Sequence, residues 1–154
     1  MDSTYSLMKG EKIISWVPTK EDSFSNQLID AYLNGKKDGM EQYKKLEISK
    51  MEENIKKTGI VASYILNTFK NNKFAPIDAY LRVNSFDRFD IMVTVPEDDC
   101  LKENFLDMYD VISDIETKSK EEFYMVFISI CSINNYFDEQ IVISDGYSWK
   151  LEKT

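Results

Sequence analysis

The stretch IDAYLRVNSFDRFDIMVTVP, from Ile77 to Pro96, decides the fold class expected for this chain of 154 residues. Apolar and polar residues alternate from Ile77 to Val83, and they alternate again from Phe89 to Val95. A period of two is typical of strands with one buried face, and the short NSFDR segment between the two runs favours a hairpin connection. The stretch therefore predicts an antiparallel pair of strands, the second ending at Pro96.

The residues after Pro96 predict a helix and then a third strand. The acidic run Glu97 to Asp99 is typical of a helix start, because free amide groups and the helix dipole stabilise negative charge there. Apolar residues then recur at steps of four and three, as expected of an amphipathic helix packed on the hairpin: Leu101, Phe105, Met108, Ile112 and Ile115. The segment Glu121 to Ile133 is apolar at both odd and even positions. We expect it to form a strand buried on both faces at the centre of the sheet.

The last segment, Asn134 to Glu152, predicts a terminal strand in one of two arrangements. Either a short helix precedes an edge strand, or a hairpin turns at Asp145-Gly146, a dipeptide that accepts positive φ easily. Tyr147 and Trp149 alternate on one strand face, which suits covering of the core or stacking on a ligand.

A helical arm, residues 22–71, precedes the hairpin in the expected order. Its first helix starts at Asp22 or Ser23, and a turn at 34–39 separates it from a second helical segment at 40–71. A heptad seam that includes Ile48, Met51 and Ile55 predicts an interaction surface, either with the arm's first helix or with a second copy of the chain. Gly59 leaves open whether 40–71 is one helix or two. Before the arm, a short apolar cluster ends at Pro18, and Ile14 and Trp16 alternate in it as a strand would.

The fold class predicted from these segments is α+β. We expect a single domain, 1–154, in which a helical arm of two or three helices packs on a core at 76–152. That core is a small, mainly antiparallel sheet of about four strands with one amphipathic helix, in a ββαββ-like order. A length of 154 residues is sufficient for one hydrophobic core.

The charge balance bears on the class of partner. Acidic residues outnumber basic ones by 27 to 19, for a net charge of −8. Nucleic-acid binding depends on cationic side chains, so nucleic acid is an unlikely partner and a basic protein is accommodated more easily. Only Arg82 and Arg88 carry the guanidinium fork that clamps phosphate.

Several kinds of chemistry are excluded by residue types. The chain has no histidine, which removes histidine-based hydrolysis, histidine-zinc sites and histidine pH switching. No run of 18 apolar residues occurs, and the N-terminal residues lack a secretory signal, so we expect a cytoplasmic protein without a membrane span. Cys100 and Cys131 are expected as reduced thiols in that compartment.

One pair of carboxylates is a candidate metal site. Asp78 and Asp90 lie on the polar face of the predicted hairpin, and two carboxylates on adjacent strands can hold Mg²⁺ together with water and phosphate. The order of elements, with FDIMVTVPED as the carboxylate strand, resembles the nucleotidyltransferase superfamily, and the resemblance implies metal-dependent transfer or a catalytically degenerate relative. The turn lacks that family's Gly-Ser pair. Asp87 and Asp90 are three residues apart, which places them on opposite faces of a regular strand.

The function expected first is protein–protein interaction through the helical arm and the acidic surface, with no catalytic residue and no cofactor assigned. The partner is an unknown protein or a second copy of the chain. A nucleotidyltransferase-like protein that uses Mg²⁺ is the first alternative. An inhibitor or immunity-type protein that mimics nucleic-acid charge is the second.

Overall fold

The structure is a computed structural model that describes residues 15–19 and 41–152, with side chains from residue 45 onward in the second range. The expected first helix of the arm and the turn at 34–39 lie outside the described residues. Strand β1 (Trp16–Pro18) is followed by helix α3 (Glu41–Asn71), which is a single helix through Gly59. Strands β2 (Asp78–Ser85) and β3 (Arg88–Pro96) form the predicted hairpin.

The second half of the chain alternates helices and strands. A short α4 (Glu97–Cys100) and a 3₁₀ turn (Glu103–Phe105) lead into α5 (Leu106–Ser119). Strand β4 (Met125–Ile133), helix α6 (Glu139–Ser144) and strand β5 (Trp149–Leu151) complete the fold. The expected helix does start at Glu97, but it is interrupted between α4 and α5. Leu101 caps the C-terminus of α4 and is exposed, and the extended backbone at Lys102 separates α4 from the 3₁₀ turn and α5.

The five strands form one mixed sheet in the order β1-β5-β2-β3-β4. Three of the four pairings are antiparallel, and β3 pairs with β4 in parallel. The predicted α+β class is confirmed, with five strands instead of about four. The parallel pair follows from the connection through α4 and α5, because a crossover helix brings the next strand back in the same direction.

Two placements within the sheet differ from expectation. The segment predicted at the centre of the sheet, β4, is an edge strand, and β5 lies between β1 and β2 instead of at an edge. On the α5 side of β4, Val126 is buried and Ile128 and Ile130 are partly buried, whereas Phe127 on the opposite face is 49% exposed. Apolar residues at both odd and even positions thus indicate a strand with two apolar faces. The α5 side carries the fully buried Val126, and the opposite face is covered only in part, since Met125, Cys131 and Ile133 are partly buried.

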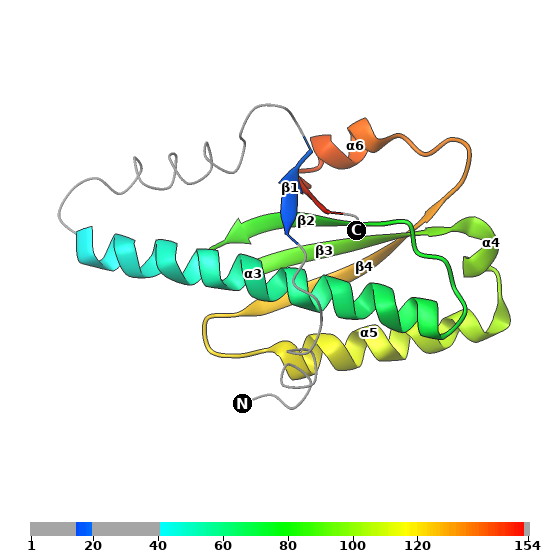
Figure 1. Cartoon of the computed structure of the whole chain (residues 1–154), viewed down its shortest axis with the longest axis horizontal. Coiled ribbons are helices and arrows are strands. Elements are labelled where there is room, and N and C mark those ends of the chain that lie inside the picture. Colours follow the sequence, from blue (N-terminus) through cyan, green and yellow to red (C-terminus); the bar gives the residue numbers. More distant parts are fainter. Residues whose placement is uncertain (1–14, 20–40, 153–154) are drawn as a thin grey trace.

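Helices cover the two faces of the sheet unequally (Figure 1). Helices α3 and α5 run side by side along one face, and α6 lies on the other face near β1 and β5. The main core lies under α3 and α5. It is built from fully buried side chains of α3, of the hairpin's apolar face and of α5, among them Ile65, Phe69, Leu81, Ile91, Val93 and Ile115. In the part of the chain that the structure describes, no helix is both long and apolar enough to cross a bilayer.

Candidate functional site

Asp78 and Asp90 lie on the same face of the hairpin, opposite the main core. Asp78 is registered with Thr94, and Asp90 is registered with Arg82, four residues further along β2. Four residues of extended strand span about 13 Å. The structure therefore does not bring these two carboxylates together around a common point. Within residues 15–19 and 41–152, no group of three or more Asp, Glu, Cys or His side chains is arranged to hold a metal ion.

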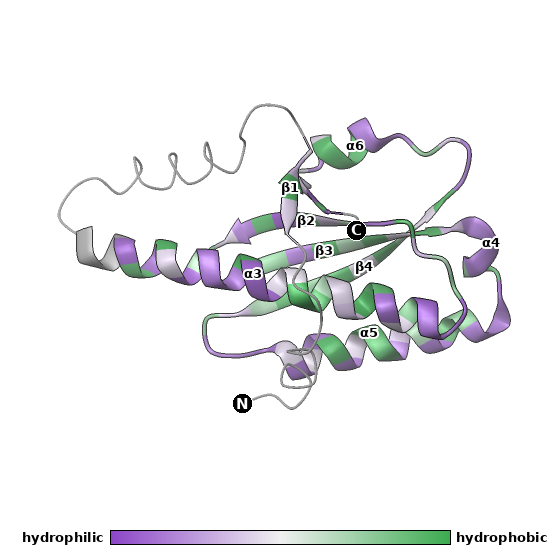
Figure 2. Ribbon diagram, in the orientation of Figure 1, coloured by the Kyte–Doolittle hydropathy of each residue, from purple (hydrophilic) through white to green (hydrophobic). Residues whose placement is uncertain are grey.

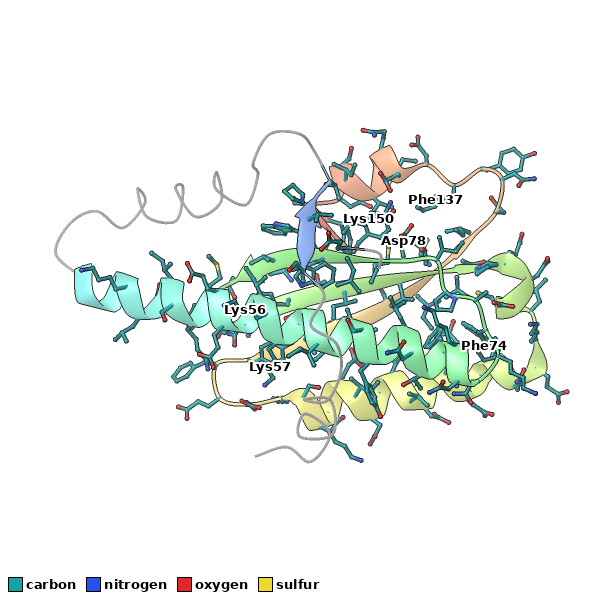
Figure 3. The ribbon with its side chains drawn as sticks, in the orientation of Figure 1. Lys56, Lys57, Phe74, Asp78, Phe137 and Lys150 are labelled. Carbon is teal, nitrogen blue, oxygen red and sulfur yellow. The ribbon has the colours of Figure 1, made fainter. Side chains whose placement is uncertain are left out.

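Each of the two carboxylates has a basic partner of its own. Arg82 donates to one oxygen of Asp90 from both Nε (2.9 Å) and an Nη (2.7 Å), and Asn84 donates to the same oxygen at 2.9 Å. Lys150 of β5 lies 3.5 Å from Asp78, and Figure 3 shows these two side chains close together. Both aspartates are thus held in ion pairs on the sheet surface.

A polar network ties α6 to this face of the sheet. Glu139, the first residue of α6, accepts a hydrogen bond from the Tyr80 hydroxyl at 2.5 Å and another from Lys150 at 2.9 Å. The hydrogen bonds from Tyr80 and Lys150 lower the pKa of Glu139, while burial and the Glu139 carboxylate raise the pKa of Tyr80. For Lys150, burial opposes the charged form, but the two carboxylates outweigh it and raise its pKa. These pKa shifts favour an ionised Glu139, a neutral Tyr80 and a protonated Lys150, which are the forms that make the observed hydrogen bonds. The network therefore holds α6 against the sheet.

The other acidic candidates also have structural partners. Asp87, the carboxylate in the turn, accepts a hydrogen bond from Ser85 Oγ at 2.7 Å. Asp99, in the predicted acidic helix start, is buried and accepts from the Ala75 backbone N–H at 2.7 Å. Both cysteines are free thiols. Tyr147 and Trp149 separate: Trp149 joins the main core, and Tyr147 packs on the opposite face under the guanidinium of Arg82.

The predicted interaction residues of the arm are directed largely toward the protein itself. Met51 is 2% exposed, and Ile55 packs against the main core. Ile48 is half-buried. The indole N–H of Trp16 in β1 donates to the Ile55 carbonyl at 3.2 Å. The described contacts of the seam are with the main core and β1, and its two explanations, contact with the arm's first helix or with a second copy, both stay predictions.

The feature that sequence reasoning missed is an edge of β4 that pairs with no strand among residues 15–19 and 41–152. The Met125 N–H donates to the Asp87 carbonyl at 2.8 Å, on the β3 side, whereas the Ile128 N–H donates in the other direction to Glu116 of α5, also at 2.8 Å. Backbone groups of a strand alternate in direction along the chain. The N–H and C=O groups of Ile130 and Ser132 therefore point away from the sheet, like those of Ile128.

The composition of this edge is unusual for an exposed strand. Strand β4 is nine residues long, MVFISICSI, and contains neither charge nor proline. Figure 2 shows it coloured largely hydrophobic, in contrast to the hydrophilic α4. Soluble proteins generally protect a strand edge with charge, proline, a bulge or short length, because bare backbone groups pair with other chains. On β4, the carboxylate of Glu116, from the adjacent helix α5, covers one of the outward backbone N–H groups.

The start of β4 is positioned by a buried amide. Asn54 of α3 is 1% exposed, and its Nδ2 donates to the carbonyls of both Phe86 and Phe123 at 2.9 Å. Phe123 has a φ of 65°, an uncommon conformation for a bulky residue. Beside these two rings lies an apolar hollow of about 280 Å³, which Leu46 also lines. Nearby, Lys57 points from α3 toward the segment before β4 and pairs with Glu121 at 2.6 Å (Figure 3).

The sequence identifies one neighbour of β4, but it does not show that the other side of β4 is an edge. The helix before β4 predicts a parallel pairing with β3, but it does not say whether a further strand follows on the other side of β4. Comparison of the chain with protein-family models, with curated proteins and with solved structures found no significant match.

Proposed function

We propose that this protein acts by binding another protein, and that the contact is addition of an extended segment to the edge of β4 that no described strand covers. The observation that supports the proposal is the outward direction of the backbone groups of Ile128, Ile130 and Ser132 on an uncharged strand. In strand addition, main-chain hydrogen bonds supply affinity, and side chains on alternate positions supply specificity.

The side chains beside this edge suit such a partner. On the open face, Phe127 is half-exposed and offers an apolar contact to alternate residues of an added strand. On the helix side, Tyr109 of α5 lies two turns before Glu116, is 52% exposed and packs edge-on against Phe105. A bound segment therefore has apolar surface on the side of its backbone that faces Phe127.

Replacement of one outward N–H tests the proposal. Ser132→Pro deletes an N–H that points away from β3, and the Ser132 side chain is exposed, so the fold should tolerate the change as edge strands generally do. We expect a partner captured from an extract of the source cells by the wild-type chain to be lost with Ser132→Pro, and retained with Ser132→Thr, which keeps the N–H. The captured partner should also slow amide hydrogen exchange at Ile130 and Ser132.

A second substitution checks the assigned direction of the backbone. Cys131→Pro deletes an N–H directed at β3, so it should lower the Tm by several degrees, whereas Ser132→Pro should leave the Tm nearly unchanged. Equal capture by wild type and Ser132→Pro, with unchanged exchange at Ile130, would show that the partner does not bind along β4.

A further inference from the structure

The Glu116 carboxylate takes the place of a neighbouring strand at one position. Its Oε2 accepts the outward Ile128 N–H at 2.8 Å, the bond that a carbonyl of an added strand would accept. The outward N–H groups of Ile130 and Ser132 have no protein acceptor among the described residues. A strand that pairs along the whole edge must therefore displace Glu116 from Ile128. The displaced carboxylate then lies beside the new strand on its helix side.

The helix that flanks the edge is strongly acidic. Between Glu97 and Glu116 the chain has eight acidic residues and a single basic one, Lys102. Lys102 is engaged with the buried Asp99 at 2.9 Å. Exposed carboxylates without an ion pair among the described residues therefore remain on α4 and α5, Asp107 and Asp110 among them. A segment docked on β4 experiences a negative potential from this side.

We propose that the occupant of the β4 edge is a lysine- or arginine-bearing extended segment of another protein, which displaces Glu116 from Ile128 and pairs a cation with the released carboxylate. This inference rests on the proposed function and adds the chemical class of the partner to it. Opposite charge across such an interface supplies specificity and faster association.

Charge also disfavours a second copy as the occupant. Each chain carries a net charge of −8. Edge-to-edge pairing of two identical β4 strands would bring two Glu116 side chains and two acidic α5 helices to the same joint. Like charges at such a joint repel, so a basic segment fits better than a copy of this chain.

Three matched peptides test the inference on the full-length chain. Each is nine residues long, to match β4, and alternates valine with lysine, threonine or glutamate. Binding is measured by fluorescence anisotropy at ~0.05 M and ~0.5 M salt, where the Debye length falls from about 14 Å to about 4 Å. We expect the lysine peptide to bind at least about fivefold tighter than the threonine peptide at low salt, and the difference to shrink at high salt.

A matched pair of variants locates the effect. Glu116→Gln keeps an oxygen that accepts the Ile128 N–H but removes the charge, and it should reduce the preference for lysine over threonine about threefold. Asp114→Asn removes the same charge from the solvent side of α5, where Asp114 pairs with Lys118 at 3.2 Å, and it should leave the preference unchanged.

The outcomes separate this inference from the proposed function. Equal binding of the lysine and threonine peptides, both weakened by Ser132→Pro, overturns the basic partner and leaves strand addition intact. Absence of binding by all three peptides counts against both. A dimer mass in light scattering that Ser132→Pro reduces to a monomer identifies a second copy as the occupant and also overturns the inference.

Discussion

Asn54→Asp exchanges a double donor for an acceptor at nearly constant volume in the segment that positions β4. The wild-type amide, 1% exposed, donates both of its hydrogens, to Phe86 O and Phe123 O. An ionised carboxylate has no hydrogen to donate, and its negative charge would lie next to both carbonyl oxygens in a site that water does not reach. Leaving these two part-buried acceptors without the Asn54 donor, beside a buried charge, costs about 3–5 kcal/mol of the free energy of unfolding. The protonated acid regains one O–H donor, so the cost falls to about 1–2 kcal/mol.

The difference between the two forms sets the pH dependence. Burial and the carbonyl oxygens raise the pKa of the introduced carboxyl above about 3.9, its value in the unfolded chain. The folded variant then binds more protons than the unfolded one, so relative stability is greatest below pH ~4 and falls as the pH rises through the folded pKa. A gap of about 2 kcal/mol corresponds to a folded pKa near ~5.5, at about 1.4 kcal/mol per unit.

Urea unfolding followed by tryptophan fluorescence measures these quantities, since Trp149 is buried in the main core. The comparison is with wild type at pH ~4 and pH ~7, which cancels the titration of other groups. Asn104→Asp is the control, because Asn104 is exposed, and it should change the free energy of unfolding by less than about 0.5 kcal/mol. A cost below about 1 kcal/mol at pH ~7, or a cost that is the same at both pH values, would refute the double-donor role of Asn54.

Three further substitutions have expected outcomes. Asp99→Asn should lower the free energy of unfolding by about 1–2 kcal/mol in urea titrations, because the buried carboxylate that accepts from the Ala75 N–H loses its charge. Gly146→Ala should cost about 1–2 kcal/mol in the same assay, since Gly146 has a φ of +98° and an added Cβ has little space. Glu139→Gln should lower stability at neutral pH. The hydrogen bond from Tyr80 lowers the pKa of Glu139, so the stability that Glu139 contributes is present above pH ~4.5 and is lost as the pH falls through its folded pKa. The Tm difference between Glu139→Gln and wild type should therefore disappear at low pH.

The hairpin and the face that it buries were predictable because one physical signal decides both. Alternation with a period of two places every second residue on one face, and Leu81 and Ile91 of that face are registered with each other and fully buried. The steps of four and three in α5 identify Met108, Ile112 and Ile115 as its buried side in the same way. In these elements the local apolar pattern and the tertiary packing agree, so the sequence alone is sufficient to predict which residues are buried.

The candidate site was not predictable from the same signals. An apolar pattern reports which faces of a strand avoid water, whereas an edge is defined by the absence of a neighbour in the plane of the sheet. Strand β4 therefore has the same pattern at the edge as it would have at the centre. The separation of Asp78 and Asp90 was not predictable for a related reason: the two residues share a face, but the register places them four residues apart along the ladder. Long-range pairing decides both points.

The two edges of the sheet differ in a way that bears on function. Strand β1, at one edge, is three residues long and ends in Pro18, and short length and proline are both common protections against pairing. Strand β4, at the other edge, is three times as long, and among the described residues one side chain, that of Glu116, accepts an outward N–H of the strand. A purely structural edge would be stabilised against aggregation by a lysine or a proline at little cost to packing, for example at the exposed Ser132. The contrast between a protected edge and one held by a single displaceable carboxylate is what a reversible strand-binding surface requires.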